Sequence, residues 1–526
     1  MEEERLRSIY KASRSIKKND NSLYNALRSI YEDSIFIGEI SQVWPQLPLL
    51  ANLRCGLWYS PHFVSTCYFK STDGHCNNWS FNTSRLNLHV AHLAGQKGGC
   101  MIVDSTRRGK RFPDSMSKTI PMWTCVLNRA VASYRRRMQV DGLAVECEES
   151  IIVNHDSANT LNASLDWDCS LHLPLWVSKI EMQSIEDRLE EWTRQLVASG
   201  ADIASVASSL QKPLRPLWIS QKSLIWLNEV PDYDSWDFTP IILVTASTSV
   251  GVVQQGTSSE FSWHYISGAG DDEESWARGL TPDLFWKHSY DLISSGPYLC
   301  NQKVADIVEK DRVYHAQRGQ SAPQGSIKPL GLLSSNHLST EDKVLVVKSM
   351  EGNSTISWLG STNLAVGSIQ NGGNFHNEID CVLNCDSEAV SMCLPEADAY
   401  LHLPIVTSKF DRYSLLNNLQ SAFNFAKLNL RKGKNLLVCC RTGEDISICI
   451  CLAILTSLFD DKGTYDDGKC FEETCISKLE MRRRLVFICK FATNARPSRG
   501  NLKQTLLGPW IGYITILNHR GPTVKA

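Results

Sequence analysis

The sequence predicts an α/β fold organised in two domains. Its 526 residues exceed the roughly 100–200 typical of one domain. Towards the C-terminus, predicted strands at 379–385 and 435–440 alternate with predicted helices at 412–430 and 447–459, which is typical of crossover connections within a sheet. A polar, aperiodic stretch beginning at 316 holds two prolines and three glycines. We therefore predict domains at 1–316 and 332–526, joined by a linker at 317–331.

The N-terminal part predicts a mixed α/β domain. Short apolar runs at 100–103 and 240–248 are typical of buried strands. The stretch 184–200 predicts an amphipathic helix that Gly200 ends. The apolar face of this helix holds Ile185, Leu189, Trp192 and Leu196.

The composition excludes several classes of protein. A 43% hydrophobic content with 15 tryptophans argues against disorder. The charged N-terminal stretch is unlike a secretory peptide, and no run of about 18 apolar residues predicts a membrane span. Several of the 18 cysteines, such as Cys381 and Cys449, sit in apolar runs, which predicts buried, reduced thiols. We expect no zinc, because paired CxxC spacing is absent, and a cytoplasmic location, with the nucleus as the alternative.

Basic clusters stand out against a net charge of only -2. One follows the strand predicted at 100–103. The others comprise Arg135, Arg136 and Arg137; Arg482, Arg483 and Arg484; and Arg496, Arg499 and Lys503. Each cluster alone fits a solvated basic face, whereas several together favour a polyanionic ligand.

The stretch 435–456 resembles the phosphate-binding loop of the cysteine phosphatases, C-x2-G-x2-R-[ST]. The matching cysteine, glycine and serine are Cys440, Gly443 and Ser447. The arginine that would clamp the phosphoryl group is replaced by Ile446, and Glu444 and Asp445 would repel a dianion. We expect a degenerate loop in a phosphatase-like domain with a central sheet flanked by helices; a plain turn and an altered anion site are the alternatives.

The loop after the predicted strand 100–103 is the stronger candidate for phosphate binding. Its hydroxyl, basic and glycine residues suit a phosphate group, and loops at strand ends bind ligands in α/β proteins. The candidate phosphate-binding residues are Ser105, Thr106, Arg107, Arg108, Gly109, Lys110 and Arg111. A solvated or nuclear-targeting run is the alternative, against which the preceding buried strand argues. Asp104, which opens the loop, is a candidate catalytic acid.

Asp73 and His75 flank a glycine in a predicted turn, where an acid or base can act. An ordinary polar turn is the alternative. The chain has one acid and no T-G-x-T after its strand, so the fingerprint of the common phosphoribosyltransferases is absent.

Three long motifs together resemble the initiator tRNA phosphoribosyltransferases. They are FKSTDGHCNNWSF, GGCMIVDSTRRGKRFPDSMSKTIPMW and SGAGDDEESWARGLTPDLFWKH. The resemblance covers nearly the whole chain and includes a C-terminal domain resembling dual-specificity phosphatases. Many members of that family carry a basic residue where this chain has Glu444, a departure that weakens an anion role for the loop.

The resemblance implies an enzyme that moves a 5-phosphoribosyl group from 5-phosphoribosyl 1-diphosphate to the 2′-hydroxyl of a T-stem adenosine in initiator methionine tRNA, which excludes that tRNA from elongation. It implies Mg²⁺ on the donor diphosphate, with Asp271 and Asp272 as candidate metal ligands or as a solvated helix start. The partners expected are this tRNA and the donor, with no DNA, membrane, zinc or nucleotide cofactor. The basic clusters at 135–137, 482–484 and 496–503 are the candidate tRNA contacts. A cysteine-dependent phosphatase and a non-catalytic tRNA-binding protein are the alternatives.

Overall fold

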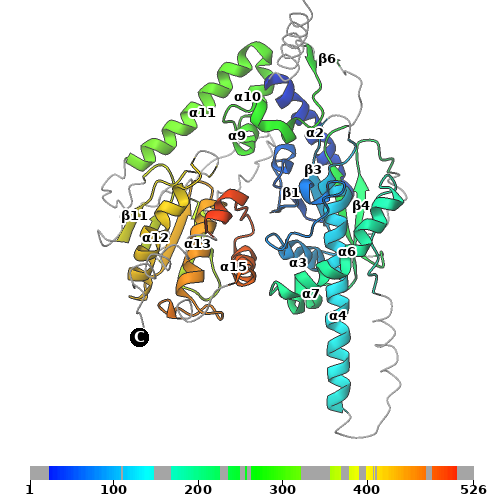
Figure 1. Cartoon of the computed structure of the whole chain (residues 1–526). Coiled ribbons are helices and arrows are strands. Elements are labelled where there is room, and N and C mark those ends of the chain that lie inside the picture. The colour runs from blue at the N-terminus through cyan, green and yellow to red at the C-terminus, as the bar shows by residue number, and fades with distance from the viewer. Residues whose placement is uncertain are drawn as a thin grey trace, which may run out of the picture. The chain divides into compact units, whose positions relative to one another are not determined.

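The computed structural model describes two compact units, one within residues 1–310 and the other within 311–526 (Figure 1). The described residues are 23–107, 110–146, 167–225, 235–248, 255–257, 262–320, 356–368, 378–389, 399–406, 408, 411–469 and 477–505. Each unit is described by itself below.

The first unit is built on a five-stranded sheet in the order β2-β1-β3-β5-β4, and all its neighbouring strands are parallel. The strands are β1 (Leu49–Asn52), β2 (Ser65–Cys67), β3 (Cys100–Asp104), β4 (Leu214–Ile219) and β5 (Thr239–Thr245). A separate hairpin pairs β6 (Gln255–Thr257) with β7 (Ser262–His264). The predicted strands at 100–103 and 240–248 are confirmed as the central β3 and β5, and the predicted α/β class is confirmed.

Helices cover this sheet and bury its apolar residues. The helix α2 (Leu23–Val43) shares an apolar core with Met101 and Val103 of β3 and Val244 of β5. Helices α3 and α4 contact strands β3 to β5. The helices after α2 are α3 (Leu88–Lys97), α4 (Ile120–Glu146), α6 (Lys179–Ala198), α7 (Ile203–Ser209), α8 (Glu273–Trp276), α9 (Pro282–Lys287), α10 (Ser289–Ser294) and α11 (Gly296–Gln320). The amphipathic helix predicted at 184–200 is confirmed within α6, which begins earlier because Ser178 caps it.

Three short helical turns complete the unit around the ends of the strands. They are η1 (Gly56–Tyr59), η2 (Ser71–Gly74) and η5 (Ala269–Asp272), and a π-helical turn, η3 (Ser115–Thr119), leads into α4. Of these four turns, η2, η3 and η5 carry polar side chains.

The second unit has a sheet in the order β11-β10-β12-β9-β8, parallel except for the edge strand β8. The strands are β8 (Ser357–Trp358), β9 (Leu364–Ser368), β10 (Cys381–Asn384), β11 (Tyr400–His402) and β12 (Leu436–Cys440). The helices are α12 (Ser414–Leu430), α13 (Ile446–Leu458) and α15 (Lys478–Phe491). They share one apolar core with a face of the sheet, so the elements predicted at 379–385, 412–430, 435–440 and 447–459 are confirmed.

Three predictions concern the whole chain: its cysteines, its linker and its membrane spans. Cys381 and Cys449 are buried free thiols. Helix α11 continues to Gln320, so the predicted linker 317–331 begins inside a helix, and its remainder lies outside the described residues. None of the described helices is long and apolar enough to cross a membrane.

Candidate active site

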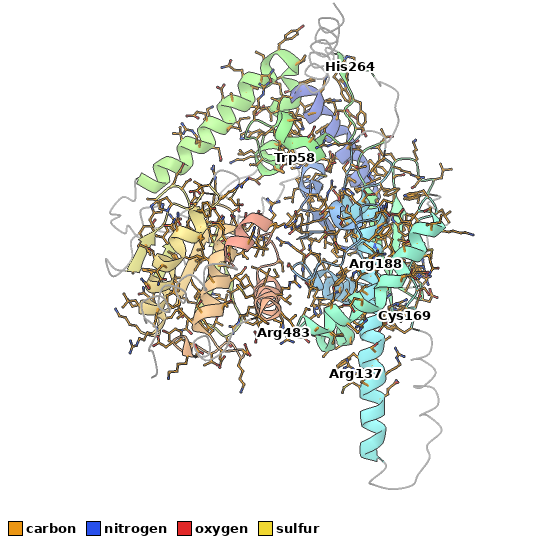
Figure 2. All side chains as sticks on the ribbon, in the orientation of Figure 1. Trp58, Arg137, Cys169, Arg188, His264 and Arg483 are labelled. Atoms are coloured by element: carbon orange, nitrogen blue, oxygen red, sulfur yellow. The ribbon has the colours of Figure 1, made fainter. Side chains whose placement is uncertain are left out.

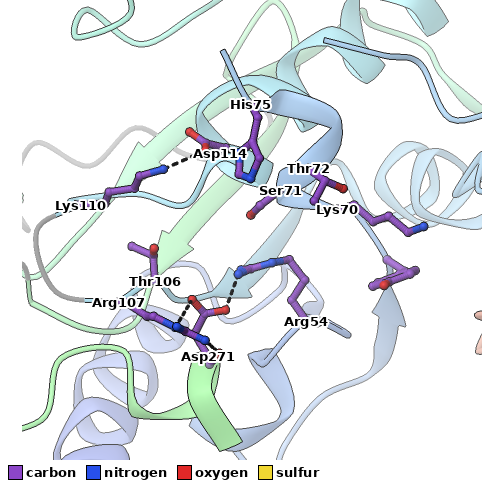
Figure 3. Close-up of a pocket in the computed structure, with 11 residues that line it drawn as sticks. Arg54, Lys70, Ser71, Thr72, His75, Thr106, Arg107, Lys110, Asp114 and Asp271 are labelled. Carbon is purple, nitrogen blue, oxygen red and sulfur yellow. Dashed lines mark hydrogen bonds and ion pairs between the residues drawn. The ribbon is translucent and has the colours of Figure 1, made fainter. Parts of the chain in front are cut away.

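A polar pocket of about 620 Å³ lies in the first unit, where the loops after β1, β2 and β3 meet (Figure 3). The strand order reverses at this point, since the chain passes from β1 to β2 on one side and to β3 on the other. Such a switch point is where open α/β sheets bind ligands. The pocket is lined by Arg54, Tyr68, Lys70, Ser71, Thr72, His75, Thr106, Arg107, Lys110, Asp114 and Asp271.

Arg54, which follows β1, is held from below by Asp104 at the end of β3. Its Nη1 donates to both carboxylate oxygens, at 3.0 and 3.1 Å, and to the Ser105 carbonyl at 3.1 Å. Its Nη2 pairs with Asp271. Burial alone would lower the pKa of Arg54, but the carboxylate of Asp104 and other neighbouring groups raise it above its usual value. The guanidinium therefore stays charged and fixed in the pocket wall.

Asp104, a candidate catalytic acid, lies beneath the pocket and is fully buried. Besides Arg54, it accepts hydrogen bonds from Asn52 Nδ2 at 2.8 Å and Ser115 Oγ at 2.7 Å. With its oxygens occupied and no surface facing the pocket, Asp104 can position Arg54 but cannot reach a substrate. The sequence placed it correctly at the strand end, and its burial favours a positioning role over the predicted catalytic one.

Arg107 closes the opposite side of the pocket through the two acids of η5. Its Nη2 lies 2.7 Å from Asp272 Oδ1, and its Nε lies 3.8 Å from Asp271 Oδ2. Gly268 allows this approach, because φ is +67° and a Cβ there would lie 2.0 Å from the Thr106 carbonyl oxygen. Burial raises the pKa of Asp271, and Arg54 opposes that rise. Two guanidinium groups thus grip one carboxylate, as they would grip a phosphate.

This arrangement bears on the predicted metal ligands. Both oxygens of Asp271 and Oδ1 of Asp272 face guanidinium groups. The described residues hold no group of three or more histidine, cysteine or acidic side chains able to bind a metal. Two arginine-paired carboxylates do not fit a protein-built Mg²⁺ site.

His75 stands on the pocket wall with Asp114 behind it. Its Nδ1 lies 2.7 Å from Asp114 Oδ2, which also accepts from Lys110 Nζ at 2.8 Å (Figure 3). Lys118 Nζ lies 3.4 Å from the other oxygen. Burial alone would raise the pKa of Asp114, but the Lys110 hydrogen bond and the Lys118 charge hold it below its usual value. A carboxylate at Nδ1 leaves Nε2 of the imidazole to accept a proton.

Other residues predicted for this site do not line the pocket. The Asp73 carboxylate accepts a hydrogen bond from Asn82 Nδ2 at 3.1 Å, and Ser105 Oγ donates to or accepts from Ser247 Oγ at 2.8 Å. Arg111 Nε donates to Ser220 Oγ at 2.9 Å. Thr106, Arg107 and Lys110 do line the pocket, whereas Arg108 and Gly109 lie outside the described residues.

Sequence reasoning missed Arg54, Lys70 and Asp114. Arg54 comes two residues after a buried apolar strand, β1, in the same kind of position as the predicted loop after β3. That placement could have identified it. No comparable signal marks Asp114, which meets His75 across 39 residues of sequence.

The Cys440 loop of the second unit forms at the end of β12, as predicted. Cys440 is 5% exposed, and its Sγ lies 3.1 Å from Ser447 Oγ. Gly443 has φ of +71°, and a Cβ there would lie 2.8 Å from Gly367. Ile446, where the phosphatase arginine would stand, is buried in the apolar core.

The two acids of this loop are fastened by the segment that follows α15. Glu444 pairs with Arg496, whose Nε lies 2.5 Å from its Oε2 and whose backbone N–H donates to its carbonyl at 2.7 Å. Asp445 Oδ1 accepts from the Ser498 N–H at 2.8 Å. The loop therefore presents fastened carboxylates and no arginine clamp, which does not suit a phosphate dianion.

The basic clusters divide between inward and outward side chains. Arg135 is used internally, since it donates to the carbonyls of Ala207 and Leu210 and lies over the Trp167 ring. Arg484 donates to the carbonyls at the end of α13. The exposed members are Arg136, Arg137, Arg482, Arg483, Arg499 and Lys503. Helix α4 extends past the other described elements of the first unit, and Arg137 lies on it (Figures 1 and 2).

Comparison with known proteins identifies relatives for both units. A Saccharomyces cerevisiae protein named tRNA A64-2′-O-ribosylphosphate transferase is 29% identical over 544 residues, which cover 95% of each chain. An uncharacterised Schizosaccharomyces pombe protein is 37% identical over 290 residues, 55% of this chain and 57% of that protein.

Among solved structures, human DUSP28 is 17% identical and covers 30% of this chain and 95% of its own, with a TM-score of 0.24. DUSP15 is 16% identical and covers 32% of this chain and 98% of its own, with a TM-score of 0.23.

Family models match both units. The model of the Rit1 DUSP-like domain matches residues 399–505, in the second unit. The model of the Rit1 N-terminal domain matches residues 16–309, more than half of the chain. The chain therefore belongs to the Rit1 family.

Proposed function

We propose that this protein transfers a 5-phosphoribosyl group from 5-phosphoribosyl 1-diphosphate to a 2′-hydroxyl of tRNA, and that its acceptor is a T-stem adenosine of initiator methionine tRNA. The observation that carries the proposal is the match along 95% of both chains to a protein named as a tRNA 2′-O-ribosylphosphate transferase. The consequence would be exclusion of the modified tRNA from elongation.

The pocket of the first unit supports this assignment through its charge. Arg54, Arg107, Lys70 and Lys110 line it, and the two arginines already grip a carboxylate, Asp271. A donor with two phosphate groupings needs cations of this kind, and the bidentate geometry of arginine suits phosphoryl oxygens. Its location at the switch point of a parallel sheet agrees with this role.

His75 is the candidate general base. In the proposed step, the 2′-oxygen of the acceptor forms a bond to C1 of the donor ribose while the bond from C1 to the diphosphate breaks. The diphosphate leaves with the bonding electrons, and His75 Nε2 takes the proton of the hydroxyl. Asp114 at Nδ1 holds the ring in the tautomer that this step needs.

Mg²⁺ would be part of the substrate. It would arrive on the diphosphate of the donor, since it keeps its own waters and prefers phosphate oxygens. The arginines of the pocket would bind the oxygens that the ion leaves uncovered.

Exposed arginines on both units suit the tRNA backbone. Arg136 and Arg137 lie on α4, and Arg482 and Arg483 lie on α15. A protein reads duplex RNA through phosphates and 2′-hydroxyls across the shallow minor groove. Binding would weaken steeply with salt.

The transfer assay separates this function from its alternatives. The full chain is incubated with donor labelled in its ribose and with initiator methionine tRNA, or with the same tRNA carrying a 2′-O-methyl group at the acceptor adenosine. Label on the first tRNA and none on the second is expected. Absence of label on both would contradict the proposal. Hydrolysis of an aryl phosphate that is lost in Cys440→Ala would favour a phosphatase, and tRNA binding with neither activity would favour a binding protein.

A further inference from the structure

An exposed apolar patch lies at the start of α6 in the first unit. Trp176 is 49% exposed, Ile180 is 82% exposed and Leu175 is fully exposed. Three large apolar side chains this close in sequence are unusual on an exposed surface. The patch therefore indicates a binding surface.

The Trp176 ring is held rigidly, as a binding surface must be. It stacks on the buried ring of Phe112, with centroids 5.0 Å apart and planes 14° apart. Trp218 meets the Trp176 ring edge-on, with centroids 6.4 Å apart, and Trp176 Nε1 lies 3.4 Å from Ser117 Oγ. Little side-chain entropy would be lost when a flat ligand group covers such a ring.

Arginines accompany the tryptophans of this region. The Arg111 guanidinium lies 5.8 Å from the Trp176 ring centroid, and the Arg188 guanidinium lies 5.2 Å from that of Trp79 (Figure 2 labels Arg188). Trp79 Nε1 donates to Glu181 Oε1 at 3.0 Å, which places this second pair beside the first turn of α6. We call Trp79, Arg111, Leu175, Trp176, Ile180 and Arg188 the tryptophan–arginine rim.

The rim borders the pocket. Phe112, which supports Trp176, is two residues from pocket residue Lys110, so their Cα atoms lie within about 8 Å. Lys118 bridges the two regions, because its Nζ lies 3.4 Å from Asp114 in the pocket and 2.8 Å from Glu181 beside the rim.

We infer that the tryptophan–arginine rim binds the RNA segment that flanks the acceptor nucleoside. This inference rests on the proposed function, in which the pocket takes the donor and a 2′-hydroxyl of RNA. The strand on either side of that hydroxyl must leave the pocket across its border. Aromatic rings that pack on bases or sugars, with arginines beside them for phosphates, are the side chains that RNA-binding surfaces use.

A protein partner is the main competing occupant, since tryptophan and arginine also dominate protein interfaces. Continuity with the pocket favours RNA. The exposed Arg111 and Arg188 beside the rings also favour a polyanion over a neutral apolar surface.

The test measures the dissociation constant of the full chain for initiator methionine tRNA, without donor, so that it requires no turnover. Leu175→Glu places a carboxylate on the rim at a side chain that supports nothing beneath it. Its matched control is Leu428→Glu, at a leucine 53% exposed on α12 of the second unit. Trp176→Ala and Trp176→Phe test the ring itself, with Tyr298→Ala as the control at an aromatic side chain 88% exposed on α11.

Trp176→Ala should weaken tRNA binding about five- to tenfold, as expected for loss of one packed ring. Leu175→Glu should weaken it to a similar extent, because its carboxylate repels the RNA phosphates. Trp176→Phe should restore most of the affinity, both controls should match the wild type, and donor binding should be unchanged throughout. Unchanged tRNA affinity in Leu175→Glu, or an equal loss of affinity in Leu428→Glu, would contradict the proposal that the rim binds RNA. A wild type that binds tRNA and transfers no label would instead refute the proposed function. The dissociation constants of the variants would still test whether the rim binds tRNA.

Discussion

The two units each end a central parallel strand in a loop that precedes a helix, yet the charges of the two loops are reversed. After β3, the acid is buried: Asp104 lies under the pocket and holds Arg54 outward. After β12, the acids stand in the loop itself, and Arg496 binds Glu444 from outside. The first arrangement offers fixed cations to a ligand, whereas the second offers fastened carboxylates.

The difference shows what a strand-end loop needs in order to bind an anion. Backbone N–H groups and a following helix are common to such loops, and α13 follows the Cys440 loop directly. Without a cation held in place, and with acids nearby, that geometry does not suffice. In the first unit, a buried carboxylate supplies the support that keeps an arginine charged and oriented.

The largest effect is expected from His75, the candidate base in the pocket of the first unit. His75→Ala should lower kcat for transfer by about 10²–10⁴-fold, the usual contribution of a general base. Asp114→Asn should lower it less, because the imidazole remains. The measurement is single-turnover transfer of labelled donor across a range of pH, with added imidazole as a rescue. A kcat in His75→Ala within threefold of the wild type would rule out this role.

Removal of the Arg54 guanidinium, which Asp104 holds in place, should have the next largest effect. Arg54→Ala removes a fixed cation that would bind the phosphates of the donor, so kcat/KM should fall about 10²–10³-fold, the usual cost of losing one preorganised donor at the reacting group. Arg54→Lys should recover little, because one ammonium cannot reach Asp104, the Ser105 carbonyl and Asp271 together. Steady-state kinetics with calorimetric donor titration would check this. Full activity in Arg54→Lys would show that charge alone matters.

Asp33 should make the stability of the first unit depend on pH. Burial raises its pKa to about 7, despite hydrogen bonds from Ser247, Tyr265 and Gln221, and Ser247 contacts Ser105 of the β3 loop. The folded state keeps the proton up to about pH 7, whereas the unfolded chain loses it near pH 4. Raising the pH between these values therefore destabilises the fold, by roughly 1 kcal/mol per unit.

Asp33→Asn cannot titrate, so it serves as the matched variant. The free energy of unfolding of the wild type relative to Asp33→Asn should fall as pH rises from about 4 to about 7, and then level off. Urea denaturation of both proteins at each pH measures the difference. A flat difference across this range would show that Asp33 is ionised in the folded protein.

The smallest effect is expected at the cysteine of the second loop. Cys440→Ala removes a buried thiol that contacts Ser447 and lies outside the pocket of the first unit, so label transfer to tRNA should stay within twofold of the wild type. Melting temperature serves as the check on folding. Loss of transfer in a folded Cys440→Ala protein would mean that the loop has a function that its contacts do not suggest.

Much of this contrast could be predicted from local sequence, because it depends on neighbouring residues. The apolar run before Asp104 marked β3, and the run before Cys440 marked β12, so both loops were located. The missing phosphatase arginine was visible at Ile446. Each of these inferences used a single strand and the residues directly after it.

The contents of the pocket could not be predicted in this way, because they depend on strand pairing. Arg54 reaches Asp104 only because β1 and β3 lie side by side in parallel. Asp114 reaches His75 only because the loop after β3 packs on η2, where Gly74 leaves room for the Asp114 carbonyl. Arg111 belongs to the predicted phosphate-binding run, yet its side chain does not line the pocket, because it turns to Ser220 and the Phe112 ring.

One measurement tests most directly the claim that the chemistry belongs to the loops after β1 and β3. Transfer of labelled phosphoribosyl groups to initiator methionine tRNA is compared in the wild type, Arg107→Ala and Cys440→Ala under identical conditions. We expect Arg107→Ala to lose transfer and Cys440→Ala to retain it. Transfer that survives in Arg107→Ala and disappears in Cys440→Ala would place the active site in the second unit and contradict its assignment to the first.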